Sequence, residues 1–184
     1  MSGNLLNFMA FQLCWFANVL GAAQAMPWAG PVVTFAWLAA HFTALRGEAR
    51  TEAWAIATAV TIGWLADSTL VLADLIAFPE QAQMGGPSPA WMVALWAGFA
   101  ATLRHALGWL RGRWLLGAAL GAAGGPLAYA SGEALGALSL SGPAGLTAVA
   151  VQYALATPLL LAVVHVSERA TATACCSAPP CIRP

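Results

Sequence analysis

The chain has 184 residues, of which 60% are hydrophobic and only 8% are charged, and its 7 basic and 7 acidic side chains cancel. An ordinary soluble domain carries about 25% charged residues, so this chain has too few to cover a surface that faces water. The composition therefore predicts an integral membrane protein. Zero net charge and the lack of a basic segment argue against a nucleic-acid partner.

Six apolar runs follow one another along the chain, separated by polar residues or by glycine and proline. A helix that crosses a bilayer needs about 20 mostly apolar residues, which is close to the length of these runs. They lie at about 5–24, 28–46, 53–78, 90–110, 114–138 and 144–166. We predict an all-α membrane bundle of about six transmembrane helices, with residues 1–170 as one membrane domain and 171–184 as a disordered cytoplasmic tail.

The basic residues of the chain are all arginines, and they gather beside alternate connections. Short loops that carry Arg or Lys stay in the cytoplasm. The arginines follow the second run, surround the end of the fourth and follow the sixth: Arg46, Arg50, Arg104, Arg111, Arg113, Arg169 and Arg183. This one-sided pattern predicts a multi-pass protein with both termini in the cytoplasm, and the use of arginine without lysine suggests a GC-rich bacterial genome.

Amides and carboxylates interrupt the first and third runs. Gln12 and Asn18 lie on a polar stripe of the first run, and such amides either hydrogen-bond across helices or line a polar cavity. Asp67 and Asp74 are seven residues apart, which places them about 10 Å apart on one face of a helix. Because a charge at the bilayer centre costs about 2.5 to 3.5 kcal/mol, each carboxylate either supports a neighbouring polar group or belongs to a site.

The fourth run ends with Arg104 and His105, and two further histidines, His41 and His165, lie at a similar depth in other runs. We expect Arg104 to reach lipid phosphates or to pair with a carboxylate. No two histidines have the HxxxH spacing, so a metal site that uses all three would need three helices to converge. We therefore predict no metal and no cofactor.

The fifth run carries a stripe of glycines that would allow another helix to approach closely. A proline inside it removes one backbone hydrogen bond. Beyond the proline, Tyr129 and Glu133 are one turn apart and could touch. Glu133 serves either packing or a ligand site. The residues to which we assign helix packing are Gly117, Gly121, Gly125, Pro126, Gly132 and Gly136.

Three motifs occur in order along the chain: NFxxFQxxWFxxV at 7–19, PxWMxxLWxxFAxTLxxxLxWL at 89–110, and GGPLAYxxGxxLGAL at 124–138. In them the chain resembles a family of small bacterial multi-spanning inner-membrane proteins catalogued as a domain of unknown function. The resemblance implies a membrane-lipid context and supplies no catalytic residues.

Three classes of function remain open. The first is a non-enzymatic accessory or scaffold that binds membrane lipid or a partner enzyme in the membrane. The second is a small transporter with a polar path near Asp67, Asp74 and Glu133, and the third is a lipid-modifying enzyme. No nucleophile motif, phosphate loop or haem signature supports the enzyme. A homo-oligomer could form through the glycine stripe of the fifth run.

Overall fold

The computed structural model describes residues 2–45 and 49–177, and within them the chain forms six α-helices. The helices are α1 (Ser2–Ala23), α2 (Ala29–Ala44), α3 (Ala49–Leu72), α4 (Ala90–Leu103), α5 (Trp114–Ala134) and α6 (Gly142–Ser177). Two 3₁₀ turns, η1 (Glu80–Ala82) and η2 (Gly108–Leu110), flank α4. The strands β1 (Ile76–Ala77) and β2 (Ser139–Leu140) form a two-residue antiparallel pair. The predicted all-α bundle is confirmed.

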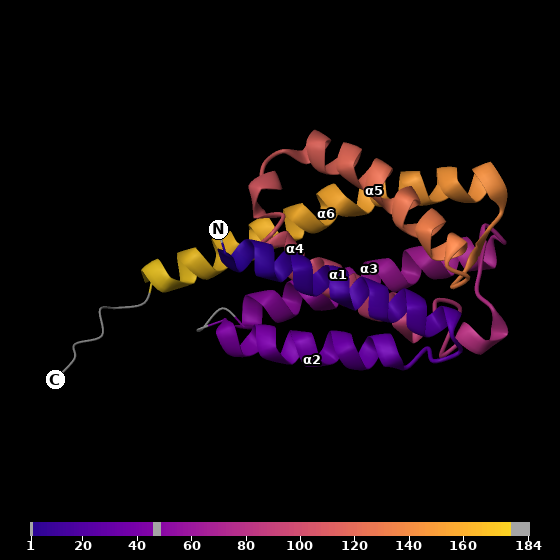
Figure 1. Cartoon of the computed structure of the whole chain (residues 1–184). Coiled ribbons are helices and arrows are strands. Elements are labelled where there is room, and N and C mark those ends of the chain that lie inside the picture. The colour runs from indigo at the N-terminus through magenta and orange to yellow at the C-terminus, as the bar shows by residue number, and fades with distance from the viewer. Residues whose placement is uncertain (1, 46–48, 178–184) are drawn as a thin grey trace.

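The helices form a bundle with α4 at its centre. Nine of the fourteen residues of α4 are buried, because the helix packs against α1, α2, α3 and α6. Helix α5 lies along α6, and α1 lies along α2, on the opposite side of the bundle in Figure 1. The start of α1 and the C-terminal end of α6 lie at the same end of the molecule (Figure 1).

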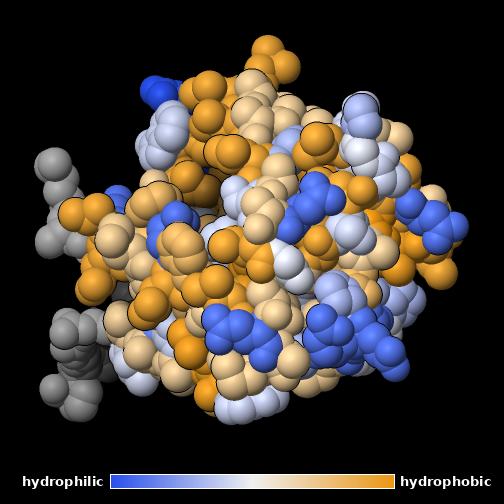
Figure 2. Space-filling model, turned by 45° about the vertical axis from the view of Figure 1, so that its right-hand side comes forward, coloured by the Kyte–Doolittle hydropathy of each residue, from blue (hydrophilic) through white to orange (hydrophobic). Residues whose placement is uncertain are grey.

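Among the described residues, three helical segments are long and apolar enough to cross a membrane: Gly3–Ala23, Ala49–Leu72 and Gly142–Arg169. Helices α2 and α4 are apolar but shorter. Apolar side chains also face outward, as in Phe35 at 76% exposure and Leu115 at 89%, and orange residues cover much of the face in Figure 2. A surface of this kind is stable in lipid rather than in water, so the chain has the features of an integral membrane protein.

Helix α3 ends six residues earlier than the apolar run that predicts it. The amide of Leu75 donates to the carbonyl of Leu70 at 2.9 Å. The amide of Asp74 donates to the carbonyl of Val71 at 3.0 Å. Together with the positive φ of 56° at Asp74, these bonds form a Schellman motif that ends the helix. Aspartate tolerates this left-handed conformation better than most residues. The expectation that Asp67 and Asp74 share a helix face is therefore wrong.

Helix α5 ends in the same way, with Gly136 at a φ of 85° and its amide bonded to the carbonyl of Glu133 at 2.9 Å. Gly136 thus lies beyond the helix and stops it, rather than extending the packing stripe. Helix α4 ends at Leu103, short of the predicted residue 110. Helix α6 continues past residue 170, where the predicted tail begins, because alanines sustain a helix after the apolar run has ended. Residues 178–184 lie outside the described part of the chain.

The glycines of α5 bring it close to α6. A side chain at Gly125 would meet the ring of Tyr153 at 2.5 Å, and one at Gly117 would meet Leu161 at 2.8 Å. At Gly121 it would collide with the backbone carbonyl of Tyr153. The predicted close approach is present, but it occurs within one chain, so α6 already covers the face through which a homo-oligomer was expected.

Candidate functional site

Asp67 lies at the centre of the bundle with no exposed surface and accepts three hydrogen bonds. The hydroxyl of Tyr129 donates to its Oδ1 at 2.6 Å, and Nε2 of Gln152 donates to the same oxygen at 2.6 Å. The indole Nε1 of Trp96 donates to Oδ2 at 2.8 Å. The partners come from α5, α6 and α4, so one carboxylate of α3 connects four helices.

A glycine one turn before Asp67 makes room for this arrangement. Any side chain at Gly63 would occupy the space of the Trp96 indole, which crosses α3 there to reach the carboxylate. Trp96 then stacks on Tyr153 with ring centroids 4.9 Å apart and planes inclined by 18°. Tyr153 in turn meets the edge of Tyr129 at 5.9 Å. The three aromatic rings form one packed layer over the carboxylate.

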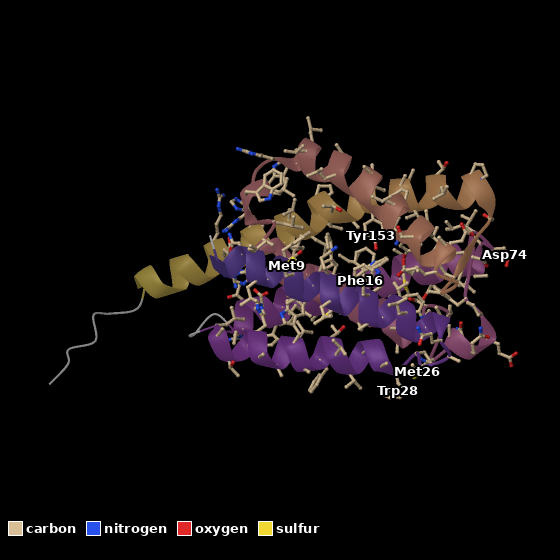
Figure 3. The ribbon with its side chains drawn as sticks, viewed as in Figure 1. Met9, Phe16, Met26, Trp28, Asp74 and Tyr153 are labelled. Carbon is tan, nitrogen blue, oxygen red and sulfur yellow. The ribbon has the colours of Figure 1, made fainter. Side chains whose placement is uncertain are left out.

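Beside this layer lies an apolar cleft with a volume of about 500 Å³. Helices α1 and α5 form its walls, and α4 and α6 form its floor. Helix α1 packs against α4, and α5 packs against α6. Figure 3 shows Phe16 of α1 and Tyr153 of α6, which both line the cleft, in the middle of the bundle. Further residues that line it are Phe11, Trp15, Leu95, Phe99, Gly124 and Leu127.

Thr157 and Gln12 are among the lining residues that give the cleft polar groups outside the aromatic layer. Thr157 is 3% exposed, and its Oγ1 has no hydrogen-bond partner among the described residues. Gln12 is half-buried and lines the wall that α1 forms. An unpaired buried hydroxyl costs about 1 to 3 kcal/mol, so a bound molecule with a polar atom would stabilise the cleft.

A second polar cluster lies where α2 ends and α3 begins. Glu52 has no exposed surface; its Oε2 accepts from Nη1 of Arg104, and its Oε1 lies 3.0 Å from Nε2 of His41. Nε of Arg104 bonds Glu168 at 3.0 Å, and Arg111 bonds the other oxygen of Glu168 at 2.8 Å. The expected pairing of Arg104 with a carboxylate is present, twice over.

The charge of Arg104 is secured by these partners. Burial alone would lower the pKa of the guanidinium, but its hydrogen bonds to Glu168 and Glu52 outweigh burial and raise the pKa above its usual range. Arg104 therefore stays protonated and neutralises the buried carboxylate. The cluster links the connection after α4 to both α3 and α6.

The structure distributes the predicted site residues over separate places. Tyr129 and Gln12 line the cleft, and Asp67 lies behind its aromatic layer. The side-chain amide of Asn18 instead donates to Oγ1 of Thr34 at 2.9 Å, a hydrogen bond that joins α1 to α2. It also donates to the carbonyl of Cys14 within α1. This is the inter-helix role that such amides usually have.

Asp74 and Glu133 lie elsewhere. Both are exposed, and Figure 3 shows Asp74 near one end of the bundle, away from Tyr153. Oε1 of Glu133 accepts a hydrogen bond from the amide of Leu140 at 2.7 Å, while Tyr129 turns to Asp67. None of the three carboxylates lines the cleft, so the geometry does not join them into one polar path.

Sequence reasoning missed several residues of both clusters. Gln152 and Tyr153 lie in the middle of an apolar run, and Glu52 lies beside the arginines of a connection, where it resembles an ordinary loop charge. One signal was available for Gln152, since an amide inside a membrane helix calls for a partner. No sequence signal points to Glu52 or to its contacts with His41 and Arg104.

The chain belongs to the family DUF2878, described as a protein of unknown function, whose model matches residues 4–159. The match includes the cleft, the aromatic layer and Glu52, and ends before Glu168. No curated protein and no solved structure matches the chain.

Proposed function

We propose that this member of the family is a non-enzymatic accessory protein that binds a membrane lipid in the cleft between α1 and α5. The carrying observation is a cleft of about 500 Å³ with apolar walls, placed between helices of a membrane bundle. This volume lies within the range of about 300 to 1,000 Å³ that small-molecule sites occupy. In a bilayer the molecules that reach such a cleft from the side are lipids.

The chemistry of the lining favours one kind of lipid. Aromatic and aliphatic walls fit an acyl or isoprenoid chain, and the glycines of α5 leave a smooth surface along it. Thr157 and Gln12 add hydrogen-bonding groups within the apolar lining. We therefore assign to the cleft a lipid whose chain carries a polar group, such as an oxygen atom, at membrane depth.

Asp67 has a supporting part in this proposal. Its two oxygens are fully engaged by Trp96, Tyr129 and Gln152, so the carboxylate holds the aromatic layer in place rather than touching the lipid. This arrangement favours an accessory role, because no described Asp, Glu, His, Lys or Cys lines the cleft, while the hydroxyl of Tyr129 donates to Asp67 and that of Ser131 to the carbonyl of Leu127.

The arginines support a location in a bacterial inner membrane with both termini in the cytoplasm. Those within the described residues lie in or beside the connections after α2 and α4 or towards the end of α6: Arg50, Arg104, Arg111, Arg113 and Arg169. Arg46 and Arg183 lie outside the described residues. A lipid entering between α1 and α5 would come from the bilayer itself.

A cavity-filling substitution tests the cleft. A Cβ atom at Gly124 meets no atom within 4 Å, and Gly124 lines the cleft, so Gly124→Leu adds its side chain on the cleft side of α5. The purified variant should retain several-fold less co-purifying lipid than the wild type, measured by mass spectrometry of extracts. Ala123→Leu is the matched control, because Ala123 is exposed on the same helix and does not line the cleft.

The same variants test the role in cells. A deletion strain complemented with the wild type or with Ala123→Leu should show the same acyl and isoprenoid lipids, and one complemented with Gly124→Leu should show the lipids of the deletion strain. Equal lipid retention by the two variants would contradict binding in the cleft. A deletion strain with an unchanged lipid composition would contradict the accessory role and favour transport.

A further inference from the structure

Two histidines and a carboxylate from three parts of the chain converge near the end of α2. His41 belongs to the last turn of α2, Glu52 to the first turns of α3, and His105 to the turn after α4. One ligand atom of each lies within 4.8 Å of the others. The imidazole rings of His41 and His105 are 5.0 Å apart and nearly perpendicular. His165 does not take part, since it contacts Trp114.

We propose that His41, Glu52 and His105 bind one divalent transition-metal ion of the Zn²⁺ type. Two imidazoles and one carboxylate are a donor set that zinc and non-haem iron use in proteins. Three protein ligands leave a further coordination position for water or another molecule. This site is separate from the lipid cleft, which none of the three residues lines.

The spacing of the His41 and Glu52 donor atoms suits an ion after a small adjustment, and the donor of His105, within 4.8 Å of both, has to move towards them by up to about 1.4 Å. Nε2 of His41 and Oε1 of Glu52 are 3.0 Å apart, which is hydrogen-bond distance. Ligand atoms about 2.0 to 2.1 Å from a tetrahedral ion are about 3.4 Å from each other. An ion at this place moves the two atoms apart by a few tenths of an ångström and binds Nε2 without a hydrogen: a neutral His41 then carries its proton on Nδ1, and a protonated His41 releases one proton to solvent.

Arg104 prepares Glu52 for this role. The guanidinium holds Oε2 at 3.0 Å, so Oε1 is the oxygen that faces His41 and is left to the ion. Ligating carboxylates are characteristically hydrogen-bonded in this way by outer-shell partners. Glu168 and Arg111 fix the guanidinium in turn. Burial also protects the donors, since the His41 side chain is 10% exposed and that of Glu52 not at all.

Cobalt(II) is the direct probe, because its visible spectrum reports the geometry and the donor atoms of its site. The full chain is purified in detergent with a tag free of histidine, with Cys175, Cys176 and Cys181 replaced by serine to remove thiolate ligands. We expect one equivalent of Co²⁺ to give the intense visible bands of a four- or five-coordinate site and Zn²⁺ to displace it. Metal analysis of protein isolated without added metal provides a second readout.

His41→Gln and His105→Gln should each weaken Co²⁺ binding by more than about tenfold, the lower end of what loss of even an outer-shell partner costs. His165→Gln is the matched control and should leave the titration unchanged. A monodisperse elution profile for each variant establishes that the bundle is folded. The proposal is overturned if the wild type gives no such spectrum, or if the spectrum survives both substitutions or is lost equally in the control.

Discussion

At the residue scale, two aspartates in and just after α3 have different roles. Asp67 meets three donors from three helices, whereas Asp74 is exposed and ends α3 through its left-handed backbone conformation. Asp67 acts through its carboxylate, which accepts the hydrogen bonds. Asp74 acts through its backbone conformation. A paired substitution separates them.

Asp67→Asn should lower the free energy of unfolding in detergent by about 1 to 3 kcal/mol, because an amide has one acceptor atom where the carboxylate offers two. If its oxygen accepts from Tyr129 and Gln152, its NH₂ group faces the N–H of Trp96. Asp74→Asn should leave stability unchanged, since asparagine also tolerates a positive φ. Thermal unfolding of both proteins measures the difference, and equal melting temperatures would sink this account of Asp67.

Glu133 permits a milder test of charge against hydrogen bonding. Its Oε1 accepts from the amide of Leu140, which fastens β2 to the end of α5. Glutamine keeps an acceptor oxygen there, so Glu133→Gln should retain the wild-type melting temperature. Glu133→Ala should lower the free energy of unfolding by about 1 kcal/mol and therefore the melting temperature as well. A loss in the glutamine variant as large as that in the alanine variant would show that the charge is needed.

At the element scale, the glycines of α5 lie on two faces of the helix, and only those that face α6 allow the close contact between α5 and α6. Gly121 faces the backbone of α6 at Tyr153, and Gly124 faces the open cleft. Both lie in the interior of the same helix, and Pro126 follows within two turns. The two positions therefore offer the same substitution with opposite consequences.

Gly121→Ala should destabilise the bundle by about 1 to 3 kcal/mol, because the added carbon meets a backbone carbonyl that cannot move aside. Gly124→Ala should stabilise it by about 0.5 to 1 kcal/mol, because alanine loses less conformational freedom than glycine in a helix interior. Thermal unfolding in detergent measures both. Two shifts of the same sign would contradict the assignment of these faces.

At the scale of the whole molecule, the sequence predicted the bundle well and the site partly. Apolar runs give the number of helices, since each must hide its backbone from lipid. They misplace ends such as that of α3, because a Schellman motif depends on the backbone at Asp74 and not on hydropathy. The sequence marked Asp67 as unusual, but its partners are 29 to 85 positions away. His41, Glu52 and His105 share no spacing that a motif could express.

The charged end of the bundle supports our proposal for its orientation in the membrane. Within the described residues, Arg104, Arg111, Glu52 and Glu168 form one ion-pair network there, so the basic residues of the connections are tied to the helix ends. Loops that carry arginine are retained in the cytoplasm during insertion. The opposite end, with Asp74 and Glu80, has no arginine among its described residues.

We therefore expect alkaline phosphatase fused after Gly85 to be active and alkaline phosphatase fused after Arg169 to be inactive, because the enzyme works only outside the cytoplasm. A fluorescent protein that matures only in the cytoplasm, fused at the same two positions, should give the reverse pattern and control for expression. Gly85 has a φ of 105° and lies in the exposed connection between η1 and α4, where a fusion leaves the first three helices intact. Active phosphatase after Arg169 together with inactive phosphatase after Gly85 would show the opposite orientation. That result would contradict the placement of the charged end in the cytoplasm.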